Sequence, residues 1–329
     1  MTTKTNLVTG FLGSGKTTTL LHLLAQKPAN ERWAVLVNEF GEIGIDGALL
    51  ADSGAVLKEI PGGCMCCVNG LPMQVGLNTL LQRNTPDRLL IEPTGLGHPK
   101  QILAMLDSAS YESWLDRQAT LCLLDARQLA DPHYLNNENF RDQLTAADII
   151  IANKQDRYTE QDRAQLAEWQ HTHGDGRPVV GATQGRIDIS LLDMPRSNQR
   201  ELPDGRHHHP HTTPTIGLAA LRLPGNTGWR RALNHGQGYH ACGWIFDGDT
   251  LFDTIGLLEW VRLAPVERVK AVMRIAEGTL TVNRQGLDLH IETRPAPPPD
   301  SRIEVINPLP ADWNSLQHLL LKNRLGVMK

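Results

Sequence analysis

One short segment constrains the fold of this chain more than any other feature. Residues 10–17 read Gly-Phe-Leu-Gly-Ser-Gly-Lys-Thr and follow an apolar run at 5–9. Leucines then recur at helical spacing through 16–27. A Gly-x-x-x-x-Gly-Lys-Thr segment between a strand and a helix is typical of a phosphate-binding loop. The weaker alternative is a glycine-rich turn before an amphipathic helix.

Chemistry assigns a role to most residues of this loop. Its glycines let successive backbone N–H groups turn toward phosphate oxygens. Lys16 places a positive charge on the β and γ phosphates, Thr17 offers its hydroxyl to Mg²⁺, and the following helix adds its N-terminal dipole. The predicted nucleotide ligands in this segment are Gly10, Gly13, Ser14, Gly15, Lys16, Thr17 and Thr18.

The first part of the chain alternates short apolar runs with amphipathic stretches. This pattern favours a mainly parallel sheet covered by helices on both faces. The predicted strands are 5–9, 33–38, 55–60, 87–91, 119–124, 148–152 and 178–182, and the predicted helices are 16–27, 70–83, 98–107, 138–146 and 159–171.

The pattern changes near residue 195. A proline-containing stretch holds His207, His208, His209 and His211, and we interpret it as an exposed linker that could also collect metal. Beyond it, strands follow one another with few helices, which predicts a smaller α+β C-terminal domain. The predicted strands are 216–223, 239–246, 268–275, 279–284, 287–293 and 302–306, with helices at 250–262 and 311–325. We therefore expect a first domain at 1–194, a linker at 195–214 and a second domain at 215–329.

The composition excludes several classes of protein. The 329 residues are 40% hydrophobic and 21% charged, with a formal net charge of -4. A mildly acidic chain offers no basic face for nucleic acid, and the apolar runs are too short to span a membrane. No apolar signal core opens the sequence, so we expect a cytoplasmic protein. Three of the five cysteines fall within four positions, which does not resemble a disulfide framework.

A second motif is suited to reading guanine. Asn153-Lys154-Gln155-Asp156 follows three isoleucines, so it lies at the carboxyl end of a predicted strand, where ligands collect. The Asp156 carboxylate can accept hydrogen bonds from N1–H and the 2-amino group of guanine, which adenine lacks. Lys154 would lie along the base plane, and Asn153 would tie the segment back to the phosphate loop. The alternative is a solvated turn.

Acidic residues end two other predicted strands. Glu92-Pro93-Thr94-Gly95 stands where nucleotide switches sense the γ-phosphate, with Glu92 suited to the Mg²⁺ shell and Gly95 to a backbone N–H on the phosphate. Glu39, Glu42 and Asp46 are candidates for magnesium, for positioning the attacking water or for a second metal. The predicted catalytic residues are Lys16, Thr17, Glu39, Glu92 and Gly95.

A thiolate cluster forms the third motif. Gly62-Gly63-Cys64-Met65-Cys66-Cys67 can bring two or three thiolates onto one cation, and thiolates favour Zn²⁺ and other borderline or soft ions over Mg²⁺. A fourth ligand could be Glu42, a histidine, water or a side chain of the recipient. The alternatives are packing cysteines or a redox pair. We expect Cys122 and Cys242 to be packed in strands.

These motifs together resemble the CobW-type GTPases, metallochaperones and metal insertases of the P-loop class. The resemblance rests on 9–18, on Asn38-Glu39-Phe40-Gly41, on 62–67 and on Glu92-Pro93-Thr94-Gly95. It implies weak intrinsic GTPase activity, metal at Cys64, Cys66 and Cys67 beside the nucleotide switches, and a C-terminal domain that helps to choose the partner. Some relatives carry an acid before the Asn-Glu-Phe-Gly segment, where this chain has Val37, so Glu42 is the remaining carboxylate candidate.

The combined prediction is a P-loop GTPase with a mainly parallel sheet that acts as a zinc metallochaperone. Its ligands would be GTP or GDP, Mg²⁺ and Zn²⁺, and its partner a metalloprotein client, with neither nucleic acid nor membrane involved. A homo-oligomer that forms with nucleotide or metal is a further candidate partner, and the sequence does not fix the oligomeric state. Two alternatives remain open: a cobalt or nickel insertase of the same family, and a zinc buffer or sensor whose nucleotide site is only structural.

Overall fold

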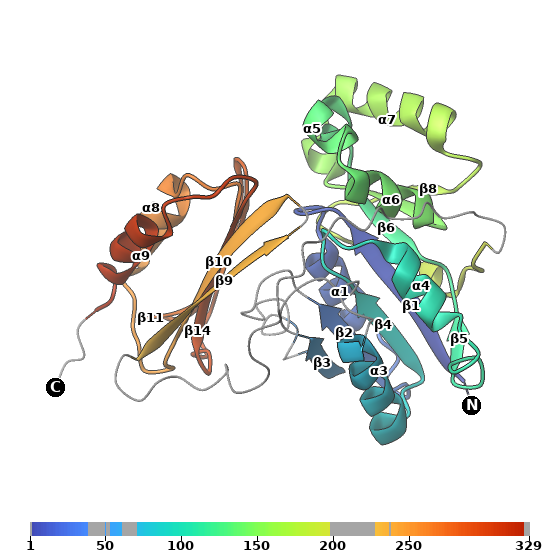
Figure 1. Ribbon diagram of the computed structural model, residues 1–329, viewed down its shortest axis with the longest axis horizontal. Coiled ribbons are helices and arrows are strands. Elements are labelled where there is room, and N and C mark those ends of the chain that lie inside the picture. The colour runs from blue at the N-terminus through green and yellow to red at the C-terminus, as the bar shows by residue number, and fades with distance from the viewer. Residues whose placement is uncertain are drawn as a thin grey trace. The chain divides into compact units, whose positions relative to one another are not determined.

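The chain forms two compact units, shown as a ribbon in Figure 1. The computed structural model describes residues 2–38, 50, 53–60, 71–197, 228–236 and 238–325. The first unit includes the described residues up to 197, and the second includes those from 228 onward. The boundaries predicted for the linker fall largely between these two parts and stay a proposal.

A parallel sheet forms the centre of the first unit. Its strands run in the order β3-β2-β4-β1-β6-β7-β8, and a three-residue strand, β5 (Leu115–Arg117), pairs with β1. The printed pairings between these strands are all parallel. The seven ordered strands are β1 (Thr3–Gly10), β2 (Trp33–Asn38), β3 (Val56–Ile60), β4 (Arg88–Glu92), β6 (Leu121–Asp125), β7 (Ile149–Asn153) and β8 (Val179–Gly181).

Alternating side chains bury both faces of this sheet. On β1, Leu7 joins a buried cluster with leucines of α3 (Leu71–Asn84) and α4 (Pro99–Leu106), whereas Val8 joins a cluster with leucines of α1 (Lys16–Ala25). Helices α5 (Pro132–Leu135) and α6 (Glu138–Ala146) connect β6 to β7, and α7 (Glu160–His173) connects β7 to β8. The predicted fold class is confirmed for this unit.

The second unit is an antiparallel sheet with two helices on one face. The order is β13-β12-β11-β14-β10-β9. Trp244, Trp260 and Leu316 meet in the core under the helices, and the Trp260 indole N–H donates to the Leu316 carbonyl at 3.0 Å. The predicted α+β class is confirmed. The elements are β9 (Trp229–Gly236), β10 (Tyr239–Phe246), β11 (Arg268–Ile275), β12 (Gly278–Gln285), β13 (Asp288–Arg294), β14 (Ser301–Asn307), α8 (Thr254–Leu263) and α9 (Trp313–Leu321).

Two strands of the structure were not predicted. β9 is an edge strand whose sequence includes Arg230, Arg231, Asn234 and His235, so it lacks the apolar alternation of a half-buried strand. β5 has only three residues, too few for a periodic pattern. The strand expected at 216–223 lies outside the described residues. Within the part of the chain that the structure describes, no helix has both the length and the apolar character needed to cross a membrane.

Candidate functional site

Three loops converge at one edge of the parallel sheet. The phosphate loop follows β1, segment 92–97 follows β4, and segment 153–158 follows β7. β4 pairs with β1, and β6 lies between β1 and β7. Because parallel strands end at the same edge of a sheet, the loops that follow them lie together, in the position where α/β proteins bind ligands.

The phosphate loop has the backbone that its glycines permit. The φ angles of Gly10, Gly13 and Gly15 are 143°, 75° and 102°, which residues with a side chain rarely adopt. The Lys16 ammonium donates to the Gly10 carbonyl at 3.0 Å and is largely buried within the loop. Ser14 is fully buried, and its hydroxyl has no hydrogen-bond partner among the described residues. The segment thus brings the Lys16 ammonium and the Ser14 hydroxyl into one loop.

The segment after β4 lies directly against this loop. The Thr17 hydroxyl donates to Glu92 Oε1 at 3.3 Å, and Glu92 is 2% exposed. A Cβ added at Gly95 would lie 3.0 Å from both the Leu12 backbone nitrogen and the Lys16 ammonium nitrogen. A side chain at this position would therefore require the neighbouring atoms of the phosphate loop to shift. A hydroxyl beside a carboxylate is an oxygen donor set that suits Mg²⁺.

Asn153 joins the third loop to the first. Its side-chain amide donates to the Ser14 carbonyl at 2.9 Å and accepts from the Gly185 N–H at 2.9 Å. A Cβ at Gly15 would collide with the Asn153 amide nitrogen, so glycine is required there for this approach as well as for its φ angle. One buried side chain thus fixes the segment 153–158 to the phosphate loop and to the loop after β8.

Lys154 and Asp156 occupy different environments. Lys154 has a left-handed φ of 62°, and its ammonium lies 3.2 Å from the buried carboxylate of Asp125 at the end of β6. The Asp156 side chain is 40% exposed, with the Arg157 guanidinium 3.9 Å away. The carboxylate predicted to read the base is therefore accessible from solvent.

Tyr158 links the ends of β6 and β7 beneath this segment. Its hydroxyl accepts from the Ala126 N–H at 2.9 Å and donates to the Asn153 carbonyl. Burial raises the pKa of this phenol well above its usual range, so the hydroxyl stays protonated and keeps donating at neutral pH.

Sequence reasoning missed four residues that organise these loops: Asp125, Gln128, Gln143 and Tyr158. Asp125 could have been found from the sequence, because, like Asn153, it is a polar residue at the end of a buried strand. The Gln128 amide donates to the Leu12 carbonyl at 3.3 Å. The Gln143 amide donates to the carbonyls of Gly95 and Gly97 at 2.9 and 3.0 Å. Neither glutamine belongs to a motif.

Several predicted residues lie outside the described residues. They are Glu39, Glu42, Asp46, Cys64, Cys66 and Cys67, together with the histidines at 207–211. The described part of the chain contains no group of three or more His, Cys, Asp or Glu side chains that could hold a metal ion. Cys122 and Cys242 are buried in strands, and burial raises the pKa of each thiol to about 12. Neither is a thiolate at neutral pH.

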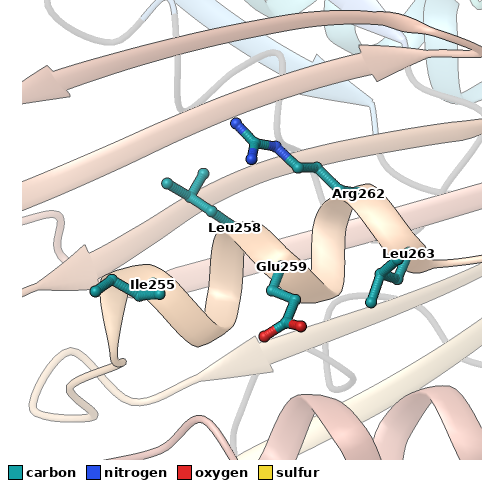
Figure 2. A pocket seen from close by; sticks show the side chains of 5 residues that line it. All are labelled: Ile255, Leu258, Glu259, Arg262 and Leu263. Atoms are coloured by element: carbon teal, nitrogen blue, oxygen red, sulfur yellow. The ribbon is translucent and has the colours of Figure 1, made fainter.

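The second unit carries a separate shallow hollow. It has a volume of about 400 Å³ and lies along the outer face of α8, lined by Ile255, Leu258, Glu259, Arg262 and Leu263 (Figure 2). Ile255 and Leu263 are 78% and 71% exposed. None of the predicted site residues lines this hollow.

Comparisons with known proteins show which family the chain resembles. The model of the CobW/HypB/UreG nucleotide-binding domain matches residues 4–180. The chain is 66% identical over 326 residues to the zinc chaperone YeiR of Escherichia coli K12, covering 99% of each protein. It is 34% identical over 194 residues to the zinc chaperone YjiA of the same organism, covering 56% of this chain and 59% of that protein. The solved structure of Zn(II)-bound YjiA GTPase from E. coli gives a TM-score of 0.46 at 19% identity, covering 99% of this chain and 100% of that one.

Proposed function

The chain belongs to the CobW/HypB/UreG family, and from this we propose that it is a cytoplasmic GTPase that binds zinc and delivers it to client proteins under GTP control. The observation that carries the proposal is the contact between two loops. Glu92 accepts from Thr17 of the phosphate loop, and Gly95 lies beside the Lys16 ammonium. A segment so placed can respond to whether a γ-phosphate is present. The 66% identity to a zinc chaperone supports zinc as the cargo.

Nucleotide binding would use the residues of the phosphate loop. Backbone N–H groups of 13–18 and the Lys16 ammonium would hold the phosphates, and the buried Ser14 hydroxyl supports a polar ligand at this place. Mg²⁺ bound by Thr17 and Glu92 would neutralise charge on the β and γ phosphates. Glu39, the residue that directly follows β2 in the sequence, would orient the attacking water.

Guanine selectivity gives the first prediction. Asp156→Asn should erode the preference for GDP over ADP by about 1–3 kcal/mol, because an amide cannot accept both guanine donors and presents a donor in their place. The measurement is titration of GDP and ADP against both proteins by calorimetry. Glu168→Gln, an equivalent change at an exposed position of α7, is the matched control and should leave the preference unaltered. Equal affinity of the unmutated protein for GDP and ADP would contradict the assignment.

Zinc would be held by Cys64, Cys66 and Cys67, with Glu42 as a candidate fourth ligand. The two remaining cysteines are poor alternatives, since burial raises the pKa of each thiol to about 12. The thiolate segment follows β3 and the acids at 39–46 follow β2, and these two strands are paired neighbours. Ordering of one segment by GTP would therefore alter the other.

This coupling is the decisive test of a chaperone cycle. We expect zinc affinity to differ by about 5- to 150-fold, or about 1–3 kcal/mol, between the GDP and GTP-analogue states. Reciprocity requires zinc to change the affinity for the analogue by the same factor. The measurement is competition for zinc against a chelator of known affinity, with apo, GDP-bound and analogue-bound protein. Parallel titrations with Co²⁺ and Ni²⁺ test the insertase alternative. Identical zinc affinities in all states would instead favour a buffer or sensor.

A further inference from the structure

Two buried glutamines donate hydrogen bonds to the phosphate loop and to segment 95–97. Both lie in the connection between β6 and β7, Gln128 in the 3-10 helix at Ala126–Ala130 and Gln143 in α6. Gln143 is 1% exposed, and its amide nitrogen donates to the carbonyls of Gly95 and Gly97. Gln128 is 7% exposed and donates to the Leu12 carbonyl. The connection between β6 and β7 therefore forms hydrogen bonds with both the phosphate loop and segment 95–97.

A second contact from α6 supports the same segment. Asp142 Oδ2 lies 2.9 Å from His98 Nδ1, and His98 is the residue that precedes α4. Asp142 and Gln143 thus hold consecutive parts of the chain from Gly95 to His98. The loop turns tightly here, since the Gly97 N–H donates to the Thr94 carbonyl and the Leu96 N–H to the Thr94 hydroxyl.

Gly95 packs closely against the phosphate loop. A Cβ on this residue would lie 3.0 Å from the Lys16 ammonium nitrogen and from the Leu12 backbone nitrogen. A small displacement of the Gly95 backbone would therefore change its distance to any phosphate held by Lys16. The hydrogen bond from the Gln143 amide restrains the carbonyl of Gly95.

We propose that Gln143 is a positioning residue that fixes segment 95–97 so that its backbone meets the γ-phosphate of GTP. The proposal rests on the proposed GTPase function and adds the residue that sets the discrimination between GTP and GDP. Gln143 touches no phosphate itself. GDP has no γ-phosphate to meet the segment, so a loosened segment should cost GTP binding and leave GDP binding nearly intact. Gln128 restrains the phosphate loop, which both nucleotides use.

The experiment compares Gln143→Met, Gln128→Met and the exposed control Gln170→Met on α7. Calorimetry with Mg²⁺ measures the affinity of each variant for GDP and for a non-hydrolysable GTP analogue. Gln143→Met removes two hydrogen bonds to buried carbonyls. We therefore expect it to lower the affinity for the GTP analogue by about 10- to 100-fold and the affinity for GDP by no more than about twofold. Gln128→Met should lower the affinities for both nucleotides by the same factor, and Gln170→Met should change neither affinity.

Gln143→Glu adds a second measurement, the pH dependence of the affinity for the GTP analogue. A carboxylate facing two carbonyls is repelled, whereas the protonated acid can donate one hydrogen bond. The affinity of this variant for the GTP analogue, relative to the unmutated protein, should therefore improve as the pH is lowered from 8 to 6. If this variant loses affinity for GDP and for the GTP analogue by the same factor at every pH, the positioning role is contradicted.

The outcomes separate this inference from the function on which it rests. If the unmutated protein binds neither nucleotide, the proposed function fails and the inference fails with it. If it binds both and Gln143→Met weakens them equally, only the positioning role is overturned. Should the variants not fold, hydrogen exchange in the unmutated protein decides: amides of 95–97 must be better protected with the GTP analogue than with GDP, and equal protection would reject the role.

Discussion

Lys16→Ala should reduce GTP hydrolysis by at least about 100-fold, the effect of removing one preorganised charge or donor from a transition state. The Lys16 ammonium is largely buried, bonded to the Gly10 carbonyl and adjacent to Gly95. It is thus held where charge on the β and γ phosphates would develop, and alanine leaves that charge unbalanced. The measurement is release of inorganic phosphate from GTP under single-turnover conditions. The same variant should keep the zinc affinity of the GDP-free protein, because the lysine serves phosphates and not thiolates.

The matched control for this change is Lys322→Ala, which removes an exposed lysine after α9 in the second unit. Its hydrolysis rate should equal that of the unmutated protein. A Lys16→Ala protein that hydrolyses GTP at the unmutated rate would show that the segment 10–17 is not the phosphate site. A variant that has lost both GTP hydrolysis and zinc binding would point to misfolding, and its thermal unfolding transition would distinguish that case.

The parallel sheet was predictable because its strands are buried on both faces. β7 reads as three consecutive isoleucines, each no more than 1% exposed, and such a run is hard to mistake. β9 gave no such signal, since an edge strand pairs on one side only and carries arginines. The pattern of apolar residues in the sequence therefore predicts the central strands of a sheet better than its edge strands.

The candidate site was predictable where its residues lie in a motif or at the end of a buried strand. Asn153 and Gly15 come from two motifs, and their contact follows from the strand order. Gln143 carries no local signal, because a single glutamine in an amphipathic helix fits an exposed position equally well. Its role depends on how α6 packs near α4 and on carbonyls 46 and 48 residues away in sequence. Contacts of that kind require the tertiary structure.

Replacing Cys64, Cys66 and Cys67 together by serine should remove the tightest zinc site and lower zinc affinity by several orders of magnitude. A serine hydroxyl is harder and far less acidic than a thiol, so it cannot replace a thiolate on a borderline metal ion. GDP affinity should change little, because the nucleotide would be held by the loops after β1, β4 and β7. The measurement is zinc competition against a chelator, paired with GDP titration on the same preparation.

Cys242→Ala is the control for this triple variant. Cys242 is fully buried in β10 with a thiol whose pKa is about 12, so it contributes no thiolate at neutral pH and its loss should leave zinc affinity unchanged. Zinc still bound by the triple variant with unmutated affinity would move the main site elsewhere, and His207, His208, His209 and His211 would be the first residues to replace. That outcome would also remove the proposed link between zinc and the nucleotide loops. The link rests on the thiolate segment following β3 in the sequence and the acids at 39–46 following β2, two strands that pair with each other.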